Sequence, residues 1–125
     1  MYLKSIGKLI QSGDWKGEKH VPVIHVKQDE ENKGKVSVKV VIGEEIPHPN
    51  TFEHYISWIK VFFQPEGSNF PVEVSTAEFD AHGELGVSTD YIAKFKFETE
   101  KPGTLYAVSY CNIHGLWENS LEITL

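Results

Sequence analysis

Residues 36–42 read VSVKVVI, and this stretch decides the fold. Valine occupies positions 36, 38 and 40 and isoleucine position 42; the intervening residues are Ser37, Lys39 and Val41. Because successive side chains of a β-strand point to opposite faces of the sheet, this alternation is typical of a strand with one buried face. Phe95 and Phe97 alternate with lysine and glutamate in the same way. The sequence therefore predicts half-buried strands at both places.

Five further segments are rich in β-branched and aromatic residues and predict strands. They are Val21–Val26, Tyr55–Phe63, Val72–Ala81, Leu105–Tyr110 and Leu116–Leu125. Turn-forming residues separate these segments and leave no room for crossover helices, so we expect about seven strands that pair antiparallel in two packed sheets. The N-terminus predicts a short helix or turn, because three apolar residues recur at helical spacing before the turn at 12–14. These residues are Leu3, Ile6 and Ile10.

Composition excludes several classes of protein. The chain has 125 residues, 18 acidic residues and 12 lysines without arginine, giving a formal charge of −6. An acidic chain without arginine is poorly equipped to bind nucleic acid, and no apolar stretch approaches the ~20 residues of a membrane span. One cysteine cannot form an internal disulfide or a four-cysteine metal site. We expect a single domain over residues 1–125, and a cytoplasmic location, because the N-terminus lacks a signal-peptide pattern.

Three short segments hold four of the six histidines and the only cysteine. They read EKHVP at 18–22, IPHPN at 46–50 with His54 following, and CNIHGLW at 111–117. His48 lies between two prolines, which present it from a stiff loop. Cys111 and His114 form a Cys-x-x-His pair, which alone is more often a buried cysteine beside a surface histidine.

Taken together, these segments offer five candidate metal ligands: His20, His48, His54, Cys111 and His114. Five ligands exceed a closed tetrahedral zinc site. A blue-copper site usually has an axial methionine, and the only methionine is Met1, so copper is disfavoured although other axial ligands exist. Five nitrogen and sulfur ligands with one position left open fit iron best.

The same segments, EKHVPVI, IPHPN with His54, and CNIHGLWE, resemble in order and spacing the signature segments of the superoxide reductase family. The resemblance is to its single-iron neelaredoxin type, similar to the catalytic domain of desulfoferrodoxins, and runs from about Ser12 to the C-terminus. It implies an immunoglobulin-like β-sandwich with one mononuclear Fe2+/Fe3+ per chain. The ligands implied are His20, His48, His54 and His114 in the equatorial plane, with Cys111 axial.

The resemblance also implies a reaction, in which superoxide takes one electron and two protons to give hydrogen peroxide. Glu18 matches the family glutamate that closes the sixth position in the ferric state, and Lys19 matches the lysine held near the open position. Lys16 is a further candidate for attracting the anion. A rubredoxin-like electron donor and a homotetramer are implied as partners.

Two other interpretations remain at this stage. One is a non-catalytic iron protein that transfers electrons on the same fold, and the other is an interaction domain with incidental histidines. His25 and His82 lie outside the motifs. We expect His25 to face solvent from a strand, and His82 to be structural or exposed at a turn. The acidic residues at 29–31 and 44–45 are interpreted as solvated turns.

Overall fold

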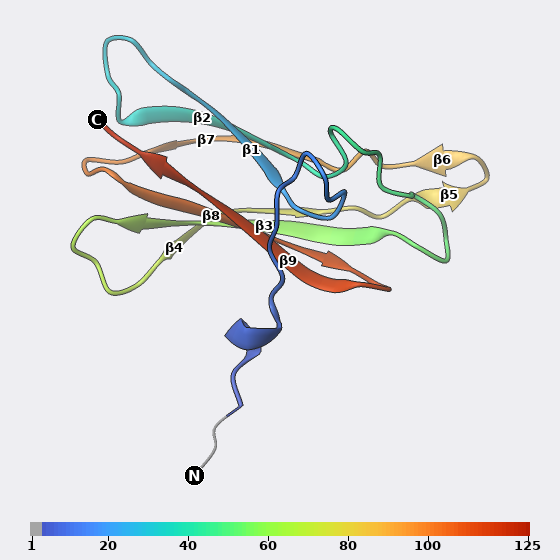
Figure 1. Cartoon of the computed structure of the whole chain (residues 1–125). Helices are drawn as coiled ribbons and strands as arrows, with labels where there is room; N and C mark the ends of the chain where they lie inside the picture. Colours follow the sequence, from blue (N-terminus) through green and yellow to red (C-terminus); the bar gives the residue numbers. More distant parts are fainter. Residues whose placement is uncertain (1–3) are drawn as a thin grey trace.

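The computed structural model describes residues 4–125 and has two antiparallel sheets that face each other (Figure 1). One sheet has the order β1-β2-β7 and the other β4-β3-β8-β9, and β5 and β6 form a separate hairpin. The strands are β1 (Val23–Gln28), β2 (Lys35–Val41), β3 (Ile56–Pro65), β4 (Val72–Glu78), β5 (His82–Glu84), β6 (Val87–Ser88), β7 (Ile92–Glu98), β8 (Gly103–Cys111) and β9 (Gly115–Ile123). This three-plus-four arrangement confirms the predicted sandwich.

The seven predicted strands all occur, with ends that differ by a few residues. The β5–β6 hairpin is additional and projects from the body of the sandwich at one end (Figure 1). Its residues are mostly exposed, so no alternation of buried and polar residues marks it in the sequence. An alternating pattern requires a row of buried side chains, and His82 is the one buried residue in these two strands.

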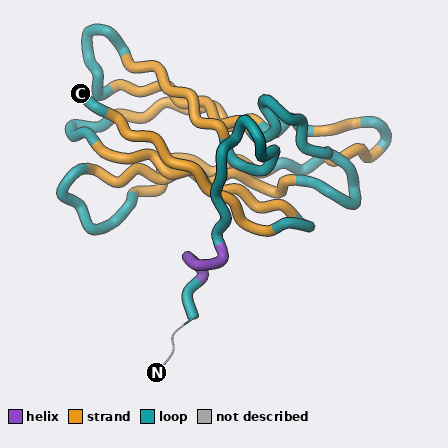
Figure 2. Tube along the Cα trace, in the orientation of Figure 1, coloured by secondary structure: helices purple, strands orange, loops and turns teal. Residues whose placement is uncertain are grey.

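The predicted N-terminal helix is a single 3-10 turn, Ile6–Leu9, which extends away from the sheets (Figure 2). Ile6 and Leu9 are 67% and 71% exposed, so the turn has no apolar face packed on the core. A helix this short is marginal without tertiary packing, which explains why it does not extend to the turn at 12–14. Leu3 lies outside the described residues. Within residues 4–125, the structure contains no helix whose length and apolar character suit a membrane crossing.

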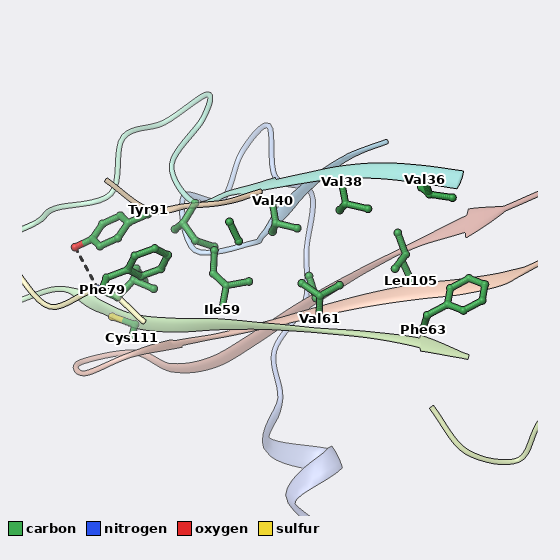
Figure 3. Close-up of a cluster of buried hydrophobic side chains, with 14 of the residues drawn as sticks. Val36, Val38, Val40, Ile59, Val61, Phe63, Phe79, Tyr91, Leu105 and Cys111 are labelled. Carbon is green, nitrogen blue, oxygen red and sulfur yellow. Dashed lines mark hydrogen bonds between the residues drawn. The ribbon is translucent and has the colours of Figure 1, made fainter. Parts of the chain in front are cut away.

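The core lies between the sheets and follows the alternation in β2 (Figure 3). Val36, Val38 and Val40 are at most 3% exposed and point toward Ile59 and Val61 of β3. Burying each such side chain contributes ~1.5–3 kcal/mol to stability. The alternate residues of β2 face outward, so the pattern that predicted a one-sided strand also determines which face of the sheet is covered.

A tyrosine side chain connects the two sheets at one end through a hydrogen bond. Tyr91, just before β7, is buried, and the N–H of Ile56 in β3 donates to its hydroxyl at 3.2 Å. Cys111 lies in the same part of the core, near Phe79 and Tyr91 (Figure 3). This end of the sandwich is where the three motif segments meet.

Candidate metal centre

Strand register brings the three motif segments together. In the first sheet Val23 pairs with Val41, so the segment before β1, with His20, and the segment after β2, with His48, leave the sheet side by side. In the second sheet Ile56 pairs with Cys111, which places His54, two residues before Ile56, next to the Cys-x-x-His turn. Residues far apart in sequence therefore converge because antiparallel strands start and end at a shared edge.

The five predicted ligands form one cluster. His20 Nε2 lies 3.2 Å from His114 Nδ1, and Cys111 Sγ lies 3.7 Å from His48 Nε2 and 3.9 Å from His114 Nδ1. The His54 ring centroid is 4.7 Å from that of His48 and 5.0 Å from that of His114. Donor atoms of His20, His54, Cys111 and His114 all lie within 4.8 Å of one another. His114 is exposed, so the cluster opens to the surface.

These residues fit a transition-metal ion. The Nε2 atom of His54 is buried and has no hydrogen-bond partner within the described part of the chain. A buried polar atom without a partner costs about 1–3 kcal/mol, which coordination of a metal would offset. Converging imidazole and thiol groups form a donor set that suits iron, copper and zinc.

The nitrogens that face away from the cluster have acceptors of their own. His48 Nδ1 donates to the Pro49 carbonyl at 2.6 Å, and His20 Nδ1 donates to Glu18 Oε1 at 2.6 Å. Because Nδ1 carries the proton in each ring, Nε2 of the neutral ring has a free lone pair directed at the cluster. The neighbours in the chain therefore select the tautomer that can bind a metal.

Burial also keeps two of these histidines, His48 and His54, neutral. Burial lowers the pKa of His48 to about 4, and the charges of His20, His54 and Lys19 act in the same direction against the bond to Pro49. Burial likewise lowers the pKa of His54, with help from His114, His20 and Lys19. A metal ligand must be deprotonated, so these shifts favour binding at neutral pH.

Glu18 lies on the outer side of His20 in this structure. Its carboxylate accepts bonds from the His20 ring at 2.6 Å and from the His20 main-chain N–H at 3.0 Å. Partial burial would raise the pKa of Glu18, but the two bonds from His20 and the charge of Lys19 outweigh it and lower the pKa. The Glu18 side chain remains 35% exposed. It therefore stays ionised beside the cluster and is accessible to solvent.

Lys19 supplies a positive charge at the same place. Its ammonium group lowers the pKa of Glu18, His48 and His54, which places it close enough to act on all three. Lys16, in contrast, is exposed and lies over the Trp15 ring, with Nζ 5.8 Å from the ring centroid.

The turn after β8 holds Cys111. The thiol is fully buried, and the main-chain N–H of His114 donates to Sγ at 3.4 Å. Gly115 adopts φ +81°, a left-handed conformation that closes the turn back into β9 and favours glycine. The sequence CNIHG therefore forms a tight turn in which the thiol and the imidazole face the same point.

Residues 12–120 match the family described as desulfoferrodoxin. The superoxide reductase of Pyrococcus furiosus is 55% identical over 127 aligned positions that cover 96% of this chain and 98% of that protein. The neelaredoxin of Megalodesulfovibrio gigas is 44% identical, over 94% of this chain and 95% of that protein. The solved structure of the reduced superoxide reductase (neelaredoxin) from Archaeoglobus fulgidus superimposes with a TM-score of 0.87 at 56% identity, over 94% of this chain and 99% of that one. The chain belongs to the superoxide reductase family.

Membership of this family confirms the predicted resemblance and identifies the chain as an oxidoreductase. The family and the His/Cys cluster together indicate iron as the metal.

Three residues that shape this site received no role from the sequence, although Trp117 lies within the CNIHGLW segment. Gln11 Nε2 donates to the His114 carbonyl at 2.7 Å, and its main chain pairs with β9 beside Trp117. Trp117 stacks on His20 with ring centroids 4.9 Å apart, and Tyr91 donates to the Pro49 carbonyl at 2.9 Å. These contacts join residues up to 103 positions apart, so no local pattern could have found them.

One supporting residue had a partial signal. Asn112 lies inside the Cys-x-x-His motif, and its side chain accepts from the Tyr55 N–H at 2.8 Å and donates to the Glu53 carbonyl at 3.0 Å. These two bonds flank His54. Asn112 therefore joins the two segments that carry His54 and Cys111.

The two histidines outside the motifs differ from each other. His25 faces solvent from β1, as predicted, with its side chain 47% exposed and paired with Glu44 at 2.6 Å. Glu44 is thus more than a solvated turn residue. His82 is buried, at 7% exposure, and hydrogen-bonded through both ring nitrogens, which supports the structural interpretation and contradicts an exposed one.

Proposed function

We propose that the chain reduces superoxide to hydrogen peroxide at one iron ion held by four histidines and one cysteine. The ligands are His20, His48, His54, His114 and Cys111. The observation that carries this proposal is the convergence of four imidazole nitrogens and one thiol at a surface-exposed point, where His54 Nε2 lacks any other partner in residues 4–125. The overall reaction takes one superoxide, one electron and two protons to one hydrogen peroxide.

When bound, the iron supplies the electron, and a thiolate ligand favours its ferric state. Cys111 suits this role because it is fully buried and accepts the His114 N–H at 3.4 Å. The turn closed by Gly115 holds the sulfur against the imidazoles. Glu18 and Pro49 keep the Nδ1 protons of His20 and His48 turned away from the metal.

Lys19 attracts the substrate in this proposal. Superoxide is an anion and the chain carries −6, so the overall charge opposes its approach. Salt screens charges beyond ~8 Å at physiological ionic strength, so a lysine beside the site outweighs distant carboxylates. The effect of Lys19 on the pKa of His48 and His54 supports its nearness to the cluster.

Glu18 would supply a carboxylate ligand to the ferric iron in this proposal. To do so, the carboxylate gives up its bond to His20 Nδ1, which it can do because it is partly exposed and follows Gly17. The ferric absorption spectrum of a Glu18→Ala variant tests this role. A spectrum identical to that of the parent protein would show that Glu18 is not a ligand.

We also propose, from the family, a single iron-binding domain over residues 1–125, a homotetramer, a rubredoxin-like electron donor and a cytoplasmic location. Size-exclusion chromatography with light scattering tests the tetramer. Reduction of the ferric protein by candidate donors tests the electron source.

One experiment separates this function from simple electron transfer and from dismutation. The iron-loaded protein is analysed for metal, reduced and mixed with superoxide. We expect about one iron per chain and one peroxide per electron held, without release of dioxygen. An electron carrier would form no peroxide by direct reaction with superoxide, and a dismutase would release dioxygen. A Cys111→Ala variant should form no peroxide, while His25→Ala should behave like the parent protein.

A further inference from the structure

His82 is a buried titratable residue that the proposed reaction does not use. It begins β5 and forms none of the contacts within the five-ligand cluster. Its Nδ1 lies 2.8 Å from Asn50 Oδ1, and its Nε2 lies 2.7 Å from the carbonyl oxygen of Phe79. Both ring nitrogens therefore face an oxygen at hydrogen-bond distance.

The hydrogen-bond partners determine the protonation of this ring. The Phe79 carbonyl can only accept, so Nε2 must carry a proton. The Asn50 amide is oriented by Thr89, because Asn50 Nδ2 donates to the Thr89 carbonyl at 2.8 Å. Turning the amide over would direct its oxygen at that carbonyl, so the oxygen must face His82. Nδ1 therefore needs a proton as well, and a neutral imidazole has only one N–H.

The surroundings suit a positive charge. Tyr55 stacks on the His82 ring, with centroids 4.1 Å apart and planes 17° apart, as cations favour aromatic faces. The Glu84 carboxylate accepts the main-chain N–H of His82 at 2.7 Å and supplies a nearby negative charge. The other titratable ring in contact is Tyr91, at 6.3 Å between centroids. The neighbouring acids in the chain, Asp80 and Asp90, are exposed to solvent.

The partners of His82 adjoin two of the proposed ligands. Asn50 follows His48 by two residues, and Tyr55 directly follows His54.

Pro49, between His48 and Asn50, accepts bonds from the His48 ring at 2.6 Å and from the Tyr91 hydroxyl at 2.9 Å. The segment 48–55 is thus held at its first turn through Asn50 and at its end through Tyr55. Phe79 connects this support to the end of β4.

We propose that His82 is a positioning residue, a buried imidazolium whose two N–H groups fix the segment carrying His48 and His54 at the geometry that binds the metal. This inference rests on the proposed metal site and adds a supporting residue to it. It assigns His82 no contact with substrate or metal.

The first test measures the protonation of His82 directly. The full-length protein is labelled with 15N-histidine and loaded with zinc, which is diamagnetic. The His82 signals are assigned by their loss in a His82→Gln variant. We expect both ring nitrogens to carry protons at neutral pH. A ring with one protonated nitrogen and one free lone pair would overturn the imidazolium.

The second test measures metal affinity with cobalt(II) alone. Glutamine resembles histidine in size but cannot donate to both Asn50 and Phe79 in the same geometry, so His82→Gln should bind cobalt ~10-fold more weakly and with a shifted absorption spectrum. The matched control is His25→Gln, the same change at an exposed histidine, which should match the parent protein. Parental affinity and spectrum in His82→Gln would overturn the positioning role.

A pair of variants at Asn50 keeps the proposal testable if His82→Gln fails to fold. Asn50→Leu removes the acceptor and should weaken cobalt binding. Asn50→Asp keeps an oxygen acceptor for the imidazolium but loses the bond from Nδ2 to the Thr89 carbonyl, so it should recover part of the affinity that Asn50→Leu loses. Equal loss in both would contradict the inference. A parent protein that binds cobalt but forms no peroxide would contradict the proposed function alone, because neither test above depends on turnover.

Discussion

The smallest scale at which this site is built is the individual histidine and its neighbours in the chain. His20 and His48 each place Nδ1 on an acceptor one or two residues away, Pro49 for His48 and Glu18 for His20. Local bonds thus select the reactive nitrogen before any metal is present. His54 lacks such a partner for Nε2 within residues 4–125, so it is the residue at which the metal-free protein is least satisfied.

A substitution at His54 should therefore remove metal binding and stabilise the metal-free protein. We expect His54→Leu to abolish tight iron binding and to raise the free energy of unfolding of the metal-free protein by ~1 kcal/mol, because no buried nitrogen is left unpaired. Urea unfolding of chelator-treated protein measures this. His25→Leu, at an exposed position, is the control and should change the metal-free stability little. A less stable His54→Leu protein would refute the argument.

The low pKa of His48 predicts an acid-sensitive metal-free fold. The pKa is 6.5 when the group is unperturbed and about 4 in the folded protein, so between these values the unfolded chain binds the extra proton. Stability is then full above pH 6.5, falls as pH drops toward about 4 and levels off below it. The loss attributable to His48 is about 3 kcal/mol at most.

Urea unfolding of the metal-free protein at a series of pH values tests this dependence. The lowered pKa of His54 adds a loss of the same sign. A His48→Gln variant has no ring to protonate and should show a shallower fall than the parent protein. Identical pH profiles for the two would mean that His48 does not cause the effect.

At the scale of elements, the hairpin between β8 and β9 matters most to the site. Its turn places Cys111 and His114 together, and three groups support it: Gln11, Asn112 and Trp117. The two strands of this hairpin are a central strand, β8, and an edge strand, β9, of the larger sheet. The geometry of the thiol therefore depends on a turn whose ends are fixed by the sheet.

We expect Gly115→Ala to lower both the free energy of unfolding and the affinity for cobalt. At φ +81° an alanine costs ~1–2 kcal/mol through its backbone, while its Cβ would meet only Gln11 Nε2, at an ordinary 3.7 Å. Relief of the strain would move His114 relative to Cys111. The measurements are urea unfolding and cobalt affinity.

Gly67→Ala is the matched control for this change. Gly67 has φ +84°, a Cβ added there would meet nothing within 4 Å, and the residue lies at the opposite end of β3 from the cluster. The Gly67→Ala variant should show a similar decrease in the free energy of unfolding and an unchanged affinity for cobalt. If both variants bind cobalt like the parent protein, the turn conformation does not control the site.

At the scale of the whole molecule, two sheets joined face to face bring three distant segments to one end. The charge of −6 is spread over the same molecule, and Lys19 is a local cation whose charge acts on His48 and His54. Capture of an anionic substrate is therefore a balance between a repulsive overall charge and one local cation.

Removing this cation should slow the reaction with superoxide. We expect Lys19→Ala to lower the second-order rate by ~10-fold at low salt and to weaken its salt dependence, because electrostatic attraction is screened by ions. Pulse radiolysis or stopped-flow mixing measures the rate. Lys101→Ala removes the same charge near the far end of the sandwich and should change the rate little. An unchanged rate for Lys19→Ala at low salt would exclude steering by this residue.

Most of the fold was predictable because it depends on local periodicity. The alternation in residues 36–42 records which side chains of β2 are buried, and a two-residue period is visible without any knowledge of the partner strand. The β5–β6 hairpin was not predicted because only His82 among its strand residues is buried, which gives no alternating pattern. The N-terminal helix is a single turn because Ile6 and Leu9 are exposed and form no apolar contact with the core.

The sequence by itself determined the residue types that could bind a metal, their rigid presentation by the prolines around His48, and the Cys-x-x-His pair of Cys111 and His114. Only the tertiary structure decided which atoms meet. The approach of His20 to His114, the bond from Gln11 to the His114 carbonyl and the burial of His82 all depend on strand register and long-range contacts. Such contacts leave no period in the sequence, because the packing of two sheets, and not the neighbours in the chain, brings those groups together.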